Sequence, residues 1–320
     1  MQLHIDKGSR AFLAFESCEN FLLSELSERF KIDIPYERYG RVFYFKEFPK
    51  ENINPWFSQT TLEEPFFLAF NSIGEAAGEL KKIQRNWAGS QYQFFRRSAL
   101  IQEKLPYINL KDKTFPVQIP QSPMGFYTLI SQNEILASAK TSSVLPAGKI
   151  SFVEDHINPP SRAYLKLQES LTLAKIFFNA SLPEQGQKCF EAGACPGGWT
   201  WVLAGLGANI IAVDRSPLDS RLMQNPLVEF KAHDAFTLAP KDIGPCDWVF
   251  SDVICYPSRL LEWARKWLDS CLVKNMICTI KMQGKLDWES ARRFEEIPNS
   301  RVVHLNYNKH ELTWIHCEKY

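Results

Sequence analysis

The chain has 320 residues, which is long enough for about two domains of ordinary size. Hydrophobic residues make up 45% of the sequence and aromatic residues 13%, a composition that excludes long disordered stretches. The formal net charge is only +1, so any basic surface for a polyanionic partner must be local.

The first 150 residues predict an α+β region in two parts, 1–70 and 71–150. In the first part, strands are expected at 9–15 and 41–48, with a helix at 18–30. In the second part, a helix is expected at 75–87 and strands at 116–120, 125–131 and 134–140. The stretch 141–161 contains the Pro, Gly and Ser residues of a linker, so a third domain is expected over 151–320.

Cationic and aromatic side chains alternate in the second part, over residues 81–104. The set comprises Lys81, Lys82, Arg85, Arg96, Arg97 and Lys104 with Trp87, Tyr92, Phe94 and Phe95. Cations can neutralise phosphates, and exposed rings can stack on bases, so this pattern suits RNA. An amphipathic region with its aromatic face in a core and its basic face in water produces the same pattern. The sequence leaves both interpretations open.

From residue 188 onward, strand-like and helix-like runs alternate. Strands are expected at 189–193, 210–214, 228–234, 247–252, 276–282, 302–308 and 312–319, and helices at 198–206, 260–272 and 287–297. This alternation predicts an α/β fold with a mostly parallel, seven-stranded sheet. Only residues 308–311 separate the last two strands, which is too short for a crossover, so these strands must form an antiparallel hairpin. A parallel sheet closed by such a hairpin is typical of Rossmann-like class I methyltransferases and not of NAD-binding domains.

A glycine-rich turn, FEAGACPGGWTW, joins the first of these strands to the first helix at residues 190–201. Gly193, Gly197 and Gly198 remove side chains where the chain turns sharply and a ligand approaches the backbone. A strand, a glycine turn and a helix form the usual mouth of a nucleotide-type cofactor site, and this turn alone fits NAD or S-adenosylmethionine. Cys195 is a small residue suited to the turn, since no nearby His could activate it as a nucleophile.

Two aspartates follow the next two strands. Asp214 comes about 20 residues after the turn, where a carboxylate can accept hydrogen bonds from ribose hydroxyls of either cofactor. Asp234 suits the exocyclic amine of adenine. Each carboxylate could instead cap a loop or a helix.

Eight cysteines occur without a Cys-x-x-Cys pair or a Cys/His ligand spacing, so a reduced protein without a metal site is expected. Residues 1–10 lack the apolar core of a signal peptide, and no run approaches the length of a membrane span. These features predict a cytoplasmic protein.

Four separated motifs resemble one family. They are SRAYLKLQE at 161–169, GACPGGWT at 193–200, SD at 251–252 and IKMQGK at 280–285. Together they resemble the FtsJ-like 2′-O-ribose RNA methyltransferases, and most of all the RlmM-type branch that methylates a cytidine ribose of 23S rRNA. The resemblance covers residues 155–320. It implies S-adenosylmethionine as cofactor and RNA as partner. Methyl transfer by in-line displacement needs no metal, and a monomer or weak dimer is expected.

The resemblance also implies a Lys-Asp-Lys-Glu tetrad, which falls on Lys166, Asp252, Lys281 and Glu311. Asp252 and Lys281 stand at or near the ends of predicted parallel strands, the edge at which ligands bind in open α/β sheets. A ribose 2′-hydroxyl needs its proton removed as it attacks. A free lysine has a pKa of about 10.4, and a second lysine with a nearby sulfonium can lower such a value. Lys281 is therefore the expected base, oriented and tuned by the other three residues.

The expected cofactor-binding set comprises Ser161, Gly193, Cys195, Pro196, Gly197, Gly198, Trp199, Asp214, Asp234 and Asp252. Ser161 is also expected to be the N-cap of the helix that carries Lys166. Two departures from the family pattern are Glu191, where aspartate is more usual, and VICYP after Asp252 in place of APN.

RlmM-type proteins carry an RNA-binding THUMP domain, so the resemblance implies a shortened THUMP-like region at 71–150. Two other functions stay open from the residues: an NAD-dependent oxidoreductase, and an RNA-binding protein that kept the fold without the chemistry. The intact Lys-Asp-Lys-Glu set argues against the second of these.

Overall fold

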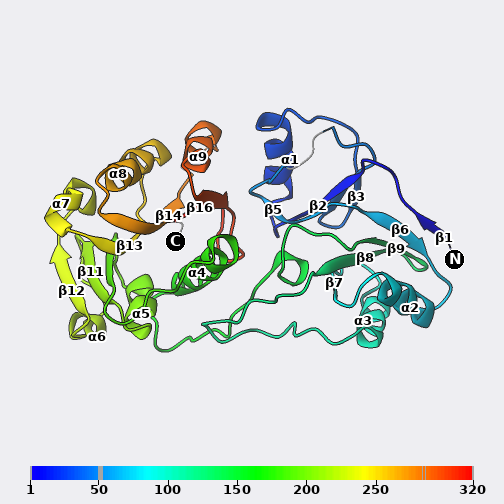
Figure 1. The fold of residues 1–320 in the computed structure, drawn as a ribbon, viewed down its shortest axis with the longest axis horizontal. Helices are drawn as coiled ribbons and strands as arrows, with labels where there is room; N and C mark the ends of the chain where they lie inside the picture. Colours follow the sequence, from blue (N-terminus) through cyan, green and yellow to red (C-terminus); the bar gives the residue numbers. More distant parts are fainter. Residues whose placement is uncertain (1, 50–52, 283, 285, 319–320) are drawn as a thin grey trace. The chain divides into compact units, whose positions relative to one another are not determined.

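The computed structural model describes residues 2–49, 53–282, 284 and 286–318 (Figure 1). The chain divides into two compact units, one formed by Met1–Lys113 with Gln118–Ser151 and the other by Thr114–Val117 with Phe152–Tyr320. Within the described residues, no helix combines the length and apolar character needed to cross a membrane.

The first unit contains two sheets. The four-stranded antiparallel sheet has the order β3 (Glu37–Tyr39), β4 (Val42–Phe45), β2 (Arg10–Ala14), β5 (Ser58–Leu62). The five-stranded sheet has the order β1 (Gln2–His4), β6 (Phe66–Ala69), β9 (Glu134–Ser138), β8 (Gly125–Ser131), β7 (Trp87–Gly89). The described residues of this unit form the α-helices α1 (Glu19–Glu28), α2 (Ile73–Ile83) and α3 (Phe95–Lys104).

The five-stranded sheet is buried on both faces. On one face Leu80 of α2 and Ile101 of α3 share a core cluster with Tyr127 of β8. On the other face Phe126, the neighbour of Tyr127, packs with Leu13 of the four-stranded sheet. Because successive side chains of a strand point to opposite faces, neighbouring apolar residues of β8 pack into the two different core clusters.

The strand expected at 116–120 is wrong, since these residues form no strand. Pro116 and Pro120 lack the backbone N–H that a ladder requires. Residues 114–117 moreover belong to the second unit, so the chain returns to the first unit within the predicted strand.

The aromatic residues of 81–104 divide between core and surface. Trp87 is fully buried and donates its Nε1–H to the Leu80 carbonyl at 2.9 Å, while Phe94 packs against the same core. Phe95 is exposed, and so are most of the cations of this segment. The interpretation of this segment as an amphipathic region with aromatic side chains in a core therefore holds for Trp87, whereas Phe95 lies on the basic surface.

The second unit holds a seven-stranded sheet. Its order is β12 (Val228–Ala232), β11 (Asn209–Asp214), β10 (Lys188–Ala192), β13 (Cys246–Ser251), β14 (Val273–Ile280), β16 (Leu312–Cys317), β15 (Ser300–Val303). The first five strands are parallel, and β16 is antiparallel to both β14 and β15. This architecture confirms the predicted α/β fold with its terminal antiparallel hairpin.

Helices cover both faces of this sheet. They are α4 (Tyr164–Phe178), α5 (Gly198–Gly205), α6 (Ser220–Met223), α7 (Pro240–Ile243), α8 (Pro257–Asp269) and α9 (Trp288–Glu295). Phe190 of β10 contacts Trp267 of α8, whereas the next residue, Glu191, is hydrogen-bonded to Thr200 of α5. Adjacent residues of a strand face opposite sides, so α8 and α5 lie on opposite faces (Figure 1).

Candidate functional site

The site lies where the strand order of the second unit reverses direction. From β10 the chain continues to β11 and β12 on one side, and from β13 it continues to β14 on the other. In open α/β sheets, ligands bind in the crevice at the carboxyl ends of such a strand pair. A pocket of about 390 Å³ opens there, between the loops that follow β10 and β13. Its lining is Ser161, Ala163, Glu191, Gly193, Ala194, Cys195, Pro196, Gly198, Trp199, Asp214, Asp252, Val253, Ile254 and Lys281.

The glycine turn forms one wall of this pocket without side chains. Gly193 has φ +76°, and a Cβ added to it would lie 2.3 Å from Val253 Cγ2. A Cβ at Gly198 would lie 2.4 Å from Ser161 Oγ. Asp214 holds the turn in place, because its Oδ2 accepts the Cys195 N–H at 3.0 Å. The turn therefore presents bare backbone to the pocket.

The residues predicted to bind the cofactor line this pocket, apart from Gly197 and Asp234. Gly197 lies just behind the wall as the N-cap of α5. Asp234 caps a short 3-10 helix by accepting the Phe236 N–H at 3.0 Å, and it also pairs with Arg215. Burial raises the pKa of Asp234, but these two contacts outweigh burial and lower it. In this structure Asp234 thus acts as a helix cap, which was the alternative to its predicted role in binding adenine.

Ser161 does not cap the Lys166 helix, so the N-cap prediction is wrong. Helix α4 begins at Tyr164, with Ala163 as N-cap and no side-chain cap bond. A turn comes first, in which Leu165 N–H reaches the Arg162 carbonyl at 3.3 Å. The Ser161 hydroxyl is buried, lines the pocket and has no hydrogen-bond partner among the described residues. An unsatisfied buried hydroxyl costs about 1–3 kcal/mol, so a ligand that bonds it would be favoured.

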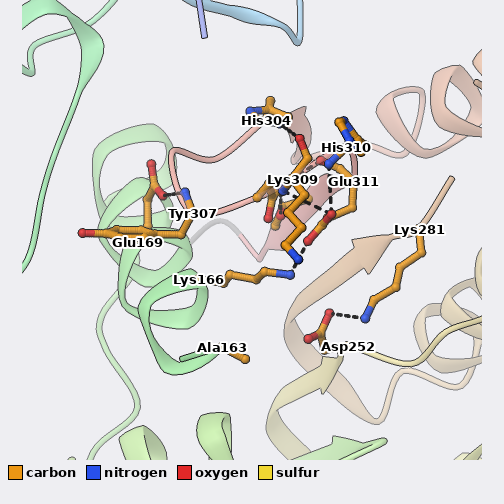
Figure 2. Close-up of polar contacts among 12 residues, drawn as sticks. Ala163, Lys166, Glu169, Asp252, Lys281, His304, Tyr307, Lys309, His310 and Glu311 are labelled. Carbon is orange, nitrogen blue, oxygen red and sulfur yellow. Dashed lines mark hydrogen bonds and ion pairs between the residues drawn. The ribbon is translucent and has the colours of Figure 1, made fainter. Parts of the chain in front are cut away.

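Two lysine–carboxylate pairs stand at the carboxyl edge of the sheet (Figure 2). Lys281 directly follows β14 and its Nζ lies 3.0 Å from Oδ1 of Asp252, which directly follows β13. Lys166 projects from α4 and forms an ion pair with Glu311, which directly precedes β16. All four side chains are largely buried.

Strand register joins the two pairs into one cluster. Ile280 of β14 is opposite Leu312 of β16, so the adjoining residues Lys281 and Glu311 leave this antiparallel ladder side by side. The structure therefore brings together the four residues predicted to form the tetrad.

Residues 159–286 match the model of the FtsJ-like methyltransferase family. This segment is an FtsJ-like methyltransferase domain. The chain is also 33% identical over 147 residues to "Ribosomal RNA large subunit methyltransferase M" of Azoarcus sp. (strain BH72), covering 46% of this chain and 40% of that protein. It is 32% identical over 205 residues to the protein of the same name from Xylella fastidiosa (strain 9a5c), covering 61% of this chain and 58% of that protein.

The chain thus spans about half the length of the curated relatives that it matches. The resemblance to the FtsJ-like family is confirmed for this domain. The match does not favour the NAD-dependent alternative.

Five residues line the pocket without having been predicted there: Ala163, Glu191, Ala194, Val253 and Ile254. Two of these are unusual for their residue type. Glu191 is 3% exposed and accepts the Thr200 hydroxyl at 2.6 Å. Burial, with the nearby charges of Asp252 and Asp214, raises the pKa of Glu191 to about 8. Ile254 is 76% exposed, an unusual value for an isoleucine, and forms part of the rim. Their positions offered a signal, since Glu191 precedes the glycine turn by two residues and Ile254 follows Asp252 by two.

The ion pair with Lys166 of α4 determines the charge state of Glu311. Burial raises the pKa of Glu311, but the hydrogen bond and charge of Lys166 outweigh it, helped by the backbone N–H groups of Glu311 itself and of His310. The result is a pKa of about 2. Glu311 therefore stays ionised throughout the range in which the protein would work.

Replacing Lys166 by methionine should make stability depend differently on pH. A depressed carboxyl pKa contributes stability that is present above the unfolded value, near 4.5, and is lost as the pH falls toward 2. The variant lacks this contribution, so its deficit in unfolding free energy should widen from pH 2 to 4.5 and then stay constant at about 2 kcal/mol, less than for a fully buried pair. Urea unfolding at pH 3, 4, 5 and 7 measures the deficit. A deficit of equal size at all four values would contradict this account.

Proposed function

We propose that this chain is an S-adenosylmethionine-dependent RNA ribose 2′-O-methyltransferase that acts on a cytidine of 23S rRNA. The observation that carries the proposal is the cluster of Lys166, Asp252, Lys281 and Glu311 beside a glycine-walled pocket. The name of the relatives, which act on the RNA of the large ribosomal subunit, supports the substrate.

The pocket fits S-adenosylmethionine. The bare backbone at Gly193 and Gly198 allows close approach of a ligand, and the Ser161 hydroxyl needs a partner. Asp214, at the end of β11, offers carboxylate oxygens to ribose hydroxyls. When bound, S-adenosylmethionine would supply an activated, electrophilic methyl group.

The reactive residues have separate roles in this proposal. Lys281 in its neutral form accepts the proton of the 2′-hydroxyl as that oxygen attacks. Asp252, 3.0 Å from the Lys281 amine, fixes the direction of the amine. Lys166 adds a second positive charge at this edge, and Glu311 holds that charge in place. Much of the acceleration would come from holding the oxygen in line for attack.

The first unit would hold the RNA. We propose that an α+β region at 1–70 is followed in the sequence by a shortened THUMP-like RNA-binding region at 71–150. The exposed cations of α2 and α3 would lie on the surface of this second region. Residues 151–320 would form the methyltransferase domain. The protein would act in the cytoplasm as a monomer or weak dimer, without a metal.

Mapping ribose methylation across total RNA from cells with and without the gene tests the substrate. We expect one 23S cytidine to lose its 2′-O-methyl group in the deletion strain, and purified protein to restore it in vitro with S-adenosylmethionine. If a different RNA loses the mark, the class of activity stands but the substrate is wrong. If no RNA changes and the purified protein transfers no methyl group, the proposed function is wrong.

A further inference from the structure

A buried carboxylate on α4 holds the loop that leads to Glu311. Glu169 is only 2% exposed, which is rare for a glutamate. Its Oε1 accepts the backbone N–H of Asn306 at 3.0 Å and the side-chain amide of Asn306 at 2.7 Å. Its Oε2 accepts the N–H of Tyr307 at 3.2 Å. Three donors thus converge on one carboxylate.

The loop 304–311 is held at its other end by Glu311 and Lys166. The N–H groups of Lys309 and His310 reach Glu311 Oε2 at 3.2 and 3.1 Å, and Lys166 pairs with Oε1 (Figure 2). Lys166 and Glu169 are three residues apart on α4, a spacing that places both on one side of the helix. One face of α4 therefore contacts the loop near both of its ends, through Glu169 and Lys166.

These bonds also explain why the predicted strand 302–308 stops early. Strand β15 ends at Val303, and the N–H groups of Asn306 and Tyr307 go to Glu169 instead of a neighbouring strand. The loop 304–311 thereby becomes long enough to bring Glu311 to Lys166.

The donor set explains why this position is a carboxylate. An ionised carboxylate only accepts hydrogen bonds, whereas a glutamine in its place must present an NH₂ group to one of the N–H groups. Glu169→Gln would keep the side-chain size but leave either Asn306 or Tyr307 facing a donor.

We propose that Glu169 is a positioning residue of the reactive cluster: through loop 304–311 it sets where Glu311, and with it Lys166, stands. This inference rests on the proposed function for its kinetic consequence, but the loop contacts themselves do not depend on it.

The kinetic test compares Glu169→Gln with wild type and with Glu25→Gln. Glu25 is a matched control, because it too is a buried glutamate that holds a loop through backbone N–H groups, those of Trp56 and Phe57 in the other unit. We expect kcat to fall about 10²-fold in Glu169→Gln, with the Kd of S-adenosylmethionine within about threefold, and kcat to change little in Glu25→Gln. Glu169→Asp keeps the charge and should recover part of kcat.

A double variant separates positioning from general damage. If Glu169 acts through Glu311, then Glu169→Gln should cost nothing further in a Glu311→Gln background. If instead the two effects multiply, or if folded Glu169→Gln keeps wild-type kcat, the positioning role is overturned.

Hydrogen exchange tests the same point without activity. Amide protection of the peptide spanning 304–311 should be lost in Glu169→Gln and kept in Glu25→Gln. Loss of protection in a protein that transfers no methyl group would support the loop contact while refuting the proposed function. Unchanged protection would overturn the inference, whatever the enzyme does.

Discussion

Replacing Lys281 by methionine is expected to lower kcat for methyl transfer about 10³-fold, within the range for loss of a general base. Methionine keeps the length of the side chain but cannot accept a proton. Because the amine is paired with Asp252 at the edge of the pocket, the cofactor-binding wall should stay intact. The Kd of S-adenosylmethionine should therefore change by less than about threefold. Single-turnover rates and isothermal titration calorimetry measure the two quantities separately.

The same pair of strands offers a matched control for Lys281. Lys274 lies on β14 near its amino end and pairs at 2.7 Å with Asp247, which lies near the amino end of β13. Lys274→Met thus removes a lysine–aspartate pair between the same strands, but at the edge of the sheet opposite the pocket. We expect it to keep kcat. Equal losses in the two variants would mean that Lys281 supports the fold and not the chemistry.

The sequence predicted most reliably what is encoded locally along the sheet. Asp252 and Lys281 could be placed because each follows an apolar run, and the carboxyl ends of parallel strands share one edge. The hairpin was equally accessible, since a short connection permits only antiparallel pairing.

Contacts between distant segments were not accessible in this way. The ion pair between Lys166 and Glu311 joins residues 145 positions apart, and only the family resemblance suggested that these residues share one site. Glu169 received no role from the sequence, because nothing near it in the chain shows that a loop would bring three donors to it. Burial of a polar group against a distant loop is a tertiary property that local patterns do not record.

Local propensity also gave the wrong start for helix α4. A serine after two prolines fits an N-cap, but a turn of i→i+3 bonds comes before α4 and moves its start to Tyr164. Ser161 is thereby released toward the pocket. The deviation from the local rule coincides with the candidate site, as expected where function overrides propensity.

Replacing Asp214 by alanine should produce the opposite kinetic signature to the Lys281 variant. Its carboxylate accepts the N–H groups of Cys195 and Ser216, both at 3.0 Å, and its remaining acceptor capacity faces the pocket. Hydrogen bonds to a charged group are each worth about 1.5–3 kcal/mol, so losing two ribose contacts and the support of the turn should raise the Kd of S-adenosylmethionine at least about 10²-fold. Because Asp214 takes no part in proton transfer, kcat at saturating cofactor should recover most of its wild-type value.

Asp247→Ala is the control for this loss of affinity. Asp247 also accepts a backbone N–H, that of Lys188 at 3.0 Å, but at the amino edge of the sheet. Both variants should lose stability because backbone N–H groups lose their acceptor, two in Asp214→Ala and one in Asp247→Ala, yet only Asp214→Ala should weaken cofactor binding. If calorimetry shows the same small change in Kd for both, the carboxylate at the end of β11 does not hold the ribose, and the pocket must bind its ligand through the glycine turn alone.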